Sequence, residues 1–212
     1  MPNNFGIIGS IPDQRSANSG VYDLNEINNL QSSSEWSNKN ALTRIETIEY
    51  DASATNQINF ESIEETQFRV HLLTIDKWVP ATDNTTMQIR MFLSGSGTAE
   101  NGTNYNYHQL RGQSAGTFNN ENTTAETFIR IGNNVGSANL EHANSVLWFF
   151  NAGDSTQRTS VMFDTTMREN SAEVKFVRGV GALNVIDDVT GIQLFVNSGN
   201  IAYVRANLYG VQ

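Results

Sequence analysis

The chain of 212 residues contains no cysteine. Disulfide bonds and thiolate metal sites are therefore both excluded, and stability must come from core area or from oligomerisation. Proline is also scarce, with 3 residues in all, and two of them, Pro2 and Pro12, lie close to the N-terminus. This uneven distribution already separates the N-terminal region from the rest of the chain.

Long hydrophobic runs and basic residues are missing as well. No stretch approaches the roughly 20 apolar residues of a membrane span, and the short apolar segment 5–8 has no basic residues before it, unlike a signal peptide. We therefore expect no membrane insertion, and synthesis and assembly in a cytoplasm. Only 13 basic residues stand against 22 acidic ones, a net charge of −9. Phosphate contacts need a basic surface, so the charge also predicts no nucleic-acid partner.

What the chain does contain is uncharged polar residues. The hydrophobic fraction is 38% and the charged fraction only 17%, so Asn, Thr, Ser and Gly supply the polarity. Disordered chains draw their polarity from charge and proline, whereas these residues populate turns and the outward faces of strands. The composition therefore predicts a folded β protein with room for one sandwich and a short appendage.

Residues 1–42 are predicted to form an extended N-terminal arm. Asp23 and Glu26 have the spacing of a capping box and predict one short helix over residues 23–31. Such a helix is too short to be stable alone, so its apolar stripe must pack on something. That surface is either one end of the parent domain or, as we favour, a partner protein to which the arm docks. The predicted docking residues are Tyr22, Leu24, Ile27, Leu30 and Trp36.

From residue 43 to 212 the hydrophobic period is two, which predicts nine or ten strands of an antiparallel β-sandwich. The phase slips at Leu72–Leu73, which predicts a β-bulge. Residues 94–104 and 112–124 read as long polar loops. The stretch from Ile192 to Tyr203, with turn residues at 197–200, predicts a closing β-hairpin.

No residue pattern predicts a catalytic, metal or cofactor site. His71, His108 and His142 have no neighbouring histidine at metal-ligand spacing, and no calcium-loop motif is present. The acidic pairs 64–65 and 187–188 could serve a glycosidase only if one member came from each, because adjacent strand residues point to opposite faces. Hydrolysis therefore remains an alternative, and the primary expectation is a protein that is not an enzyme.

One run of residues is the strongest candidate for surface recognition. Aromatic rings offer apolar faces and neighbouring amides offer hydrogen bonds, a combination suited to binding sugars or proteins. The alternative is a strand whose tyrosines pack inward while Asn106 points to water. The predicted recognition loop consists of Asn104, Tyr105, Asn106, Tyr107 and His108.

Several segments together resemble a β-sandwich module of tailed-bacteriophage virion proteins. The segments are 102–108, which follows a "G-x-N-Y" pattern, 192–200, and 207–211, which ends "L-Y-G-V". The arm segment 19–26 is similar to a "G-V-[WY]-[SD]-L-x-[ED]" pattern of phage structural proteins, whereas 93–95 departs from the residues expected before the loop. The resemblance implies a jelly-roll-like sandwich, a homotrimer, and no catalytic residues to transfer.

The sequence thus predicts a virion structural protein that is assembled in the host cytoplasm. The arm is expected to dock onto other virion proteins, and the sandwich to project as a tail-fibre or receptor-binding element that meets a host surface glycan or protein. The first alternative is a capsid decoration protein that stabilises the head. A lectin-like domain outside a virus and a glycan-degrading sandwich enzyme are the remaining alternatives.

Overall fold

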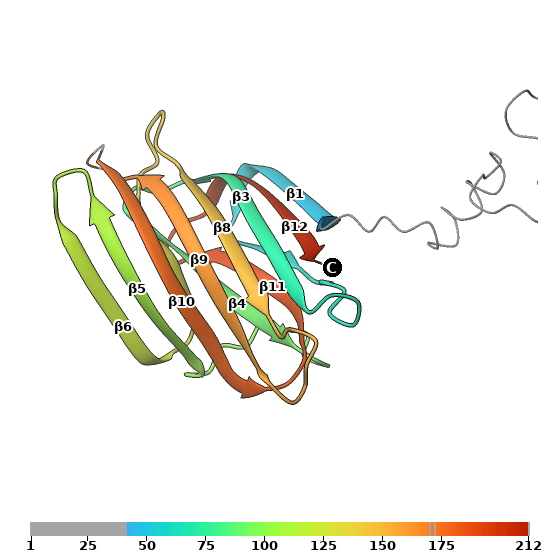
Figure 1. Ribbon diagram of the computed structural model, residues 1–212. Helices are drawn as coiled ribbons and strands as arrows, with labels where there is room; N and C mark the ends of the chain where they lie inside the picture. The colour runs from blue at the N-terminus through green and yellow to red at the C-terminus, as the bar shows by residue number, and fades with distance from the viewer. Residues whose placement is uncertain (1–41, 170, 172, 212) are drawn as a thin grey trace, which may run out of the picture. The chain divides into compact units, whose positions relative to one another are not determined.

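The computed structural model describes residues 42–169, 171 and 173–211, and these form an all-β fold, as the sequence predicts (Figure 1). The predicted docking arm, its expected helix and its five named residues lie outside this described part. Within it, every paired strand is antiparallel to its neighbours. The strands are β1 (Leu42–Thr55), β2 (Gln57–Phe60), β3 (Val70–Pro80), β4 (Thr85–Leu93), β5 (Tyr105–Gln113), β6 (Phe118–Glu126), β7 (Ile129–Val135), β8 (Ala143–Phe150), β9 (Arg158–Arg168), β10 (Val174–Ile186), β11 (Val189–Val196) and β12 (Ile201–Val211).

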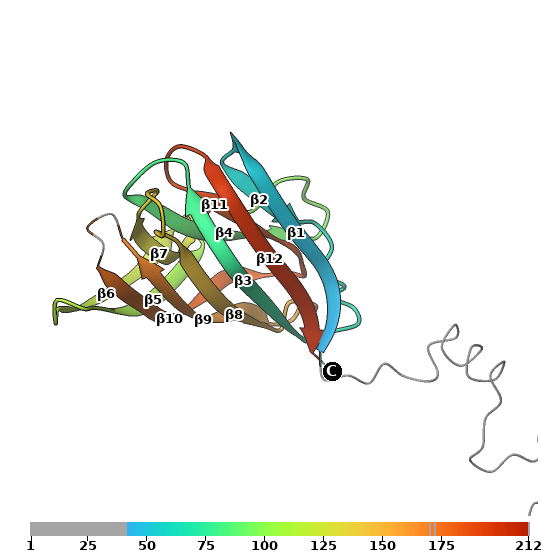
Figure 2. The ribbon, with the colours of Figure 1, turned by 90° about the horizontal axis from the view of Figure 1, so that it is seen from above.

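Eight of these strands build a jelly roll. One layer contains the order β1-β12-β3-β8 and the other is β2-β11-β4-β7 (Figure 2). The chain passes back and forth between the two layers, and its last strand returns to lie beside its first, which is the jelly-roll arrangement. The predicted jelly-roll-like sandwich is therefore confirmed.

The other four strands enter as two hairpins that widen one layer only. The pairs β9–β10 and β5–β6 continue the sheet beyond β8, giving an eight-stranded sheet against a four-stranded one. Strand β7 of the smaller sheet lies against β9, β10 and β5. Most of the added strands' inner face is thereby covered, while their outer face forms a broad surface with no second layer over it.

The core lies between the sheets and follows the period of two. In β9, Val161, Phe163 and Met167 point inward and are buried, while Met162 and Asp164 point outward. Burying a side chain of this size contributes about 1.5–3 kcal/mol. The largest fully buried side chains are Trp78, Tyr105, Phe60, Phe149, Phe163, Ile63, Leu73, Ile75, Met87, Ile89, Met91 and Ile129.

The closing hairpin predicted at the C-terminal end is wrong in one respect. Both strands and the turn exist, but β11 pairs with β2 and β4, whereas β12 pairs with β1 and β3. The turn residues therefore connect two layers and not two neighbours in one ladder. Asn197 fixes this connection, because its Oδ1 accepts a hydrogen bond from the Thr86 amide at 2.7 Å. Gly199 supports it with a positive φ of 68°.

Two other details of the strand prediction are wrong. The register of β3 does not shift at Leu72–Leu73, but between Ile75 and Trp78. Leu72 points to the outer face, opposite to His71 and Leu73, so an apolar residue on each face produced the apparent slip. The predicted polar loop 112–124 also contains most of β6, whose side chains carry no apolar alternation.

Candidate functional site

The predicted recognition loop is a strand, and its two aromatic rings are in the core. Tyr105 and Tyr107 begin β5 and are 0% and 4% exposed. The Tyr105 hydroxyl accepts a hydrogen bond from the Met91 amide and donates one to the Glu100 carbonyl, at 2.9 and 3.1 Å. The prediction of an exposed aromatic loop is therefore wrong, and the alternative with inward tyrosines holds.

The other members of that run lie apart from the tyrosines. Asn106 and His108 sit at the alternate positions of β5, where Asn106 is half-buried and His108 exposed. Asn104 precedes the strand, and its Nδ2 donates to Glu100 Oε1 at 3.4 Å. The five residues thus do not converge on one surface, because alternation divides them between the two faces of the sheet.

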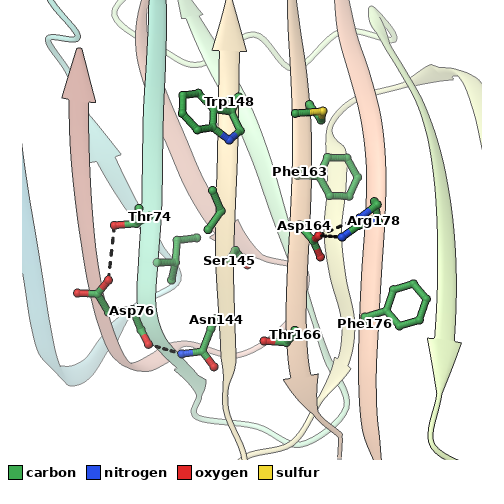
Figure 3. A pocket seen from close by; sticks show the side chains of 13 residues that line it. Thr74, Asp76, Asn144, Ser145, Trp148, Phe163, Asp164, Thr166, Phe176 and Arg178 are labelled. Atoms are coloured by element: carbon green, nitrogen blue, oxygen red, sulfur yellow. Dashed lines mark hydrogen bonds and ion pairs between the residues drawn. The ribbon is translucent and has the colours of Figure 1, made fainter. Parts of the chain in front are cut away.

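The structure instead offers a hollow on the outer face of the eight-stranded sheet. Its volume is about 1100 Å³, slightly above the roughly 300–1,000 Å³ usual for ligand sites. It lies over β3, β8, β9 and β10, where the added β9–β10 hairpin joins the jelly roll (Figure 3). We call this hollow the groove. The side chains that line it are Thr74, Ile75, Asp76, Asn144, Ser145, Val146, Trp148, Met162, Phe163, Asp164, Thr166, Phe176 and Arg178.

Strand register arranges the outward side chains of the groove in rows. Trp148 pairs with Met162 in the first row, and Val146, Asp164 and Arg178 form the second. A third row holds Asn144, Thr166 and Phe176. Neighbouring strands lie about 4.8 Å apart and alternate residues of one strand about 6.8 Å apart. Trp148 and Phe176 therefore stand at opposite corners, roughly 17 Å from each other by these spacings.

Trp148 is the principal aromatic group of the groove. Its side chain is half-buried, and the indole is drawn nearly face-on in Figure 3, so its flat surface looks out of the groove. The indole nitrogen has no hydrogen-bond partner among the described residues and is not a buried atom. A half-buried indole of this kind provides an apolar face together with a free donor.

A charged pair occupies the middle row. Arg178 donates from both Nε and Nη2 to Asp164 Oδ2, at 2.8 Å from Nε. Both side chains remain solvent-exposed, so the pair contributes little to folding stability. Its geometry fixes a carboxylate and a guanidinium side by side, each with hydrogen-bonding capacity left for a ligand.

The β3 side of the groove carries a second polar group. Asp76 accepts hydrogen bonds from Asn207 Nδ2 at 3.0 Å and from Thr74 Oγ1 at 3.5 Å. The Asn144 side chain donates to the Asp76 carbonyl oxygen, and Arg205 Nε lies 3.7 Å from the Asp76 carboxylate. Amide, hydroxyl and carboxylate groups are thus held in place along this rim.

The surface around the groove is unusually apolar for the open face of a sheet. Antiparallel sheets commonly bury one face and present polar residues on the other. Here most of the exposed large hydrophobic residues in the described part lie on this one face, and contiguous exposed patches mark interaction sites. They are Leu42, Leu110, Phe118, Val146, Met162, Val174 and Val180.

The sequence contains an indication of the groove that a search for alternating apolar and polar residues does not find. Strands with apolar residues at consecutive positions, such as 146–150 and 161–163, have something apolar on each face. Once Leu147 and Phe163 are assigned to the core, Val146, Trp148 and Met162 must point outward. Only the register between strands then shows that they adjoin one another.

Other titratable groups do not gather into a site. Among the described residues, no cluster of three or more His, Asp or Glu side chains could hold a metal ion. His71 is buried, with Nε2 2.7 Å from the Ile63 carbonyl oxygen, and burial lowers the pKa of its imidazole. The acidic pairs 64–65 and 187–188 both lie outside the strands. In the same part of the chain, no helix has the length and apolar character to cross a membrane.

Comparison of the chain with protein-family models and with curated proteins finds no match. The site is therefore interpreted from its own geometry.

Proposed function

We propose that this chain is an adhesion element of a tailed-bacteriophage particle, whose β-sandwich binds a glycan of the host surface in the groove. The observation that carries the binding function is the diagonal of outward groups across the three rows, from Trp148 through the Asp164–Arg178 pair to Phe176. The virion assignment is supported by the segments that resemble phage proteins. It places the N-terminal arm against other virion proteins. The homotrimer that the resemblance implies competes with the two-fold pairing proposed below, and sedimentation decides between them.

The chemistry of the groove favours a sugar polymer. The C–H faces of a pyranose ring stack on flat aromatic surfaces, while its hydroxyl groups need both donors and acceptors. Trp148 and Phe176 supply two such surfaces at a separation that suits a short oligosaccharide. Asn144, Asp164 and Arg178 lie between or beside them and supply hydrogen bonds.

The charges of the groove favour an uncharged glycan. The Asp164 carboxylate is matched by Arg178, and that of Asp76 lies near Arg205. Neither sign is in excess, so a polyanion gains no net attraction there, and the whole chain is acidic. Neutral surface polysaccharides therefore fit better than acidic ones.

Binding to a panel of neutral and acidic bacterial polysaccharides tests this function. We expect affinity for neutral members, because their sugar rings can stack on Trp148. Trp148→Ala should weaken binding at least tenfold, or about 1.4 kcal/mol, whereas Trp148→Phe should keep part of the affinity because it retains a flat aromatic surface. Tyr203→Ala, on β12 away from the groove, is the matched control and should bind normally. Binding that Trp148→Ala leaves intact would contradict the proposed site, and cleavage of a bound polymer would identify an enzyme.

The breadth of the apolar outer face supports a second candidate, a decoration protein that stabilises the head. Residues such as Val174 and Phe118 lie beyond the groove, and their exposure suits a protein surface more than a sugar. A decoration protein should bind preformed capsids and raise their thermal stability. Quantifying the chain in intact particles separates the two, since a head protein is present in hundreds of copies and a fibre protein in few.

Attachment through the arm is tested by deletion. Because the first described strand begins at Leu42, removing residues 1–40 should leave a folded sandwich that still binds glycan. The same deletion should abolish incorporation into particles. Incorporation of the shortened chain at normal copy number would contradict a docking role for Tyr22, Leu24, Ile27, Leu30 and Trp36.

A further inference from the structure

The two sheets have four edge strands, and β6 is the one whose central part carries no device against pairing, because its register with β5 shifts only near its end, between Thr123 and Glu126. Edge strands expose unpaired backbone groups and are usually blunted by charge, proline, bulges or short length. β1, β2 and β7 each carry such a device. β2 has only 4 residues, and β7 pairs through two register shifts and contains Asn134 with a φ of 59°.

β1 is protected by charge and irregularity. It carries Arg44, Glu46, Glu49 and Asp51, and its pairing with β12 shifts register twice. A second strand laid against this edge would meet three carboxylates. The β1 edge therefore repels another acidic chain of the same kind.

β6 runs Phe-Asn-Asn-Glu-Asn-Thr-Thr-Ala-Glu over 9 residues and contains no lysine, arginine or proline. Glu121, the acid in its middle, is turned inward and neutralised. Its Oε1 lies 2.6 Å from Arg130 Nη1 and its Oε2 3.2 Å from Arg111 Nη2. The free edge thus presents amide and hydroxyl side chains without a repelling charge at its centre.

The hairpin turn determines which backbone groups of β6 face this edge. The Gln113 amide donates to the Thr117 carbonyl at 3.1 Å, so the bonded pairs of the ladder continue at 111/119 and 109/121. The intervening residues direct their N–H and C=O groups away from β5. Phe118, Asn120 and Asn122 therefore offer a regular row of unpaired donors and acceptors.

An apolar surface adjoins the same edge. The rings of Phe118 and Phe176 meet edge-to-face, with centroids 6.3 Å apart, and Phe118 is 67% exposed. Both rings lie over Gly112, where a Cβ atom would come within 2.4 Å of Phe176. We call Leu110, Phe118, Val174 and Phe176 the apolar edge patch.

We propose that β6 is an interface with a second copy of this chain, in which two β6 strands pair antiparallel about a two-fold axis. An antiparallel pair of identical strands is self-complementary, so each copy supplies the donors that the other lacks. The two-fold axis stands perpendicular to the joined sheet, so the apolar edge patches of both copies lie on the same face of that sheet. The uncharged centre of β6 suits a like strand, whereas β1 of a second copy would bring acids.

Sedimentation of the full chain over a range of concentrations tests the interface. We expect a monomer–dimer equilibrium and concentration-dependent slowing of amide hydrogen exchange at Asn120 and Asn122. Asn120→Pro removes an outward donor without breaking a bond to β5. It should weaken dimerisation at least about tenfold.

A second variant keeps the test decisive if proline disturbs folding. Asn120→Lys with Asn122→Lys places charge on the edge and should abolish the dimer, while Asn101→Lys, in an exposed loop, should not. Circular dichroism verifies that each variant is folded. A monomer at every concentration overturns the interface. A dimer or trimer that survives the two lysine substitutions in β6 also overturns it. The same holds if amide exchange at Asn120 and Asn122 slows only when an unrelated extended peptide is added, and not when the protein concentration rises.

Discussion

The hydroxyl group of Tyr105, on the eight-stranded sheet, accepts a hydrogen bond of 2.9 Å from the backbone amide of Met91, on the opposite sheet. The same oxygen donates to the Glu100 carbonyl at 3.1 Å. One buried side chain thus joins the two layers and the loop between β4 and β5. Burial raises the pKa of this hydroxyl far above its usual range, so it stays protonated.

Replacing Tyr105 with Phe should therefore destabilise the sandwich. The ring still fills its place, but the Met91 amide and the Glu100 carbonyl lose their partner inside the protein. A buried polar group left without a hydrogen bond costs about 1–3 kcal/mol. Chemical denaturation measures this difference. Tyr203→Phe, which removes an exposed hydroxyl bonded to Glu49, should leave the unfolding midpoint unchanged, and equal effects of the two variants would contradict the explanation.

Glu121→Ala should lower the folding stability of the sandwich at the end that contains β6. Its carboxylate accepts hydrogen bonds from Tyr107, Gln109 and Arg130, forms an ion pair with Arg111, and links β6 to β7 of the other sheet. The loss leaves two half-buried guanidinium groups unpaired. We expect about 1–3 kcal/mol of destabilisation, which is below the roughly 3–5 kcal/mol of a fully buried broken pair because the arginines retain some water. Glu126→Ala, at the end of the same strand, is the control and should have little effect.

The stability of the fold should fall as the pH is lowered through the unfolded-state pKa of histidine. Burial lowers the pKa of the His71 imidazole, against a smaller opposing effect of its bond to the Ile63 carbonyl. The unfolded chain then binds a proton more readily than the folded one, so folding is favoured above about pH 6.5 and weakens below it. Thermal unfolding from pH 8 to pH 5 shows this as a falling midpoint. His71→Gln should lack this component, and an identical pH profile would argue against His71 as its source.

Gly153→Ala should be strongly destabilising. A Cβ atom at this position would lie 2.0 Å from the Glu65 carbonyl oxygen, so the loops after β2 and β8 would have to separate. Overpacking of this kind costs about 1–3 kcal/mol. Gly97→Ala is the matched control, because a Cβ atom there meets nothing within 4 Å. A comparison of the two unfolding midpoints decides the matter, and similar values would show that the loops adapt freely.

The strands that line the core were predictable, because each buries one face. The pattern of Met87, Ile89 and Met91 is an example, and all three are fully buried. β6 was not predictable, since both of its faces are largely exposed and its residues show no alternation. Local pattern also placed Ile192 and Ile201 in one hairpin. A turn between layers and a turn within one ladder use the same residue types, so only long-range pairing distinguishes them.

The candidate site was missed for a related physical reason. Alternate residues of a strand point to opposite faces of the sheet, so an aromatic ring packs inward or outward according to its position in this alternation. Tyr105 and Tyr107 lie at positions that face the core, whereas Trp148 lies at a position that faces outward. Which of the two sets of alternate residues faces the core can be determined only when the partners of each strand are known. The row that unites Asp164 with Arg178 comes from strands joined by a hairpin, but its continuation through Val146 to Thr74 crosses to β3, far back in the sequence.

The position of β12 between β1 and β3 imposes an order on biosynthesis. β1 is among the first described strands to leave the ribosome, yet its ladder partner is made only when translation has reached Val211. Until then β1 and β3 carry unpaired edges, and the sheet lacks the strand that joins them. Such non-local pairing makes folding slow and leaves nascent chains prone to aggregation. The fold thus couples correct assembly to the synthesis of β12, and chains terminated before that strand are expected to become substrates for chaperones and proteases.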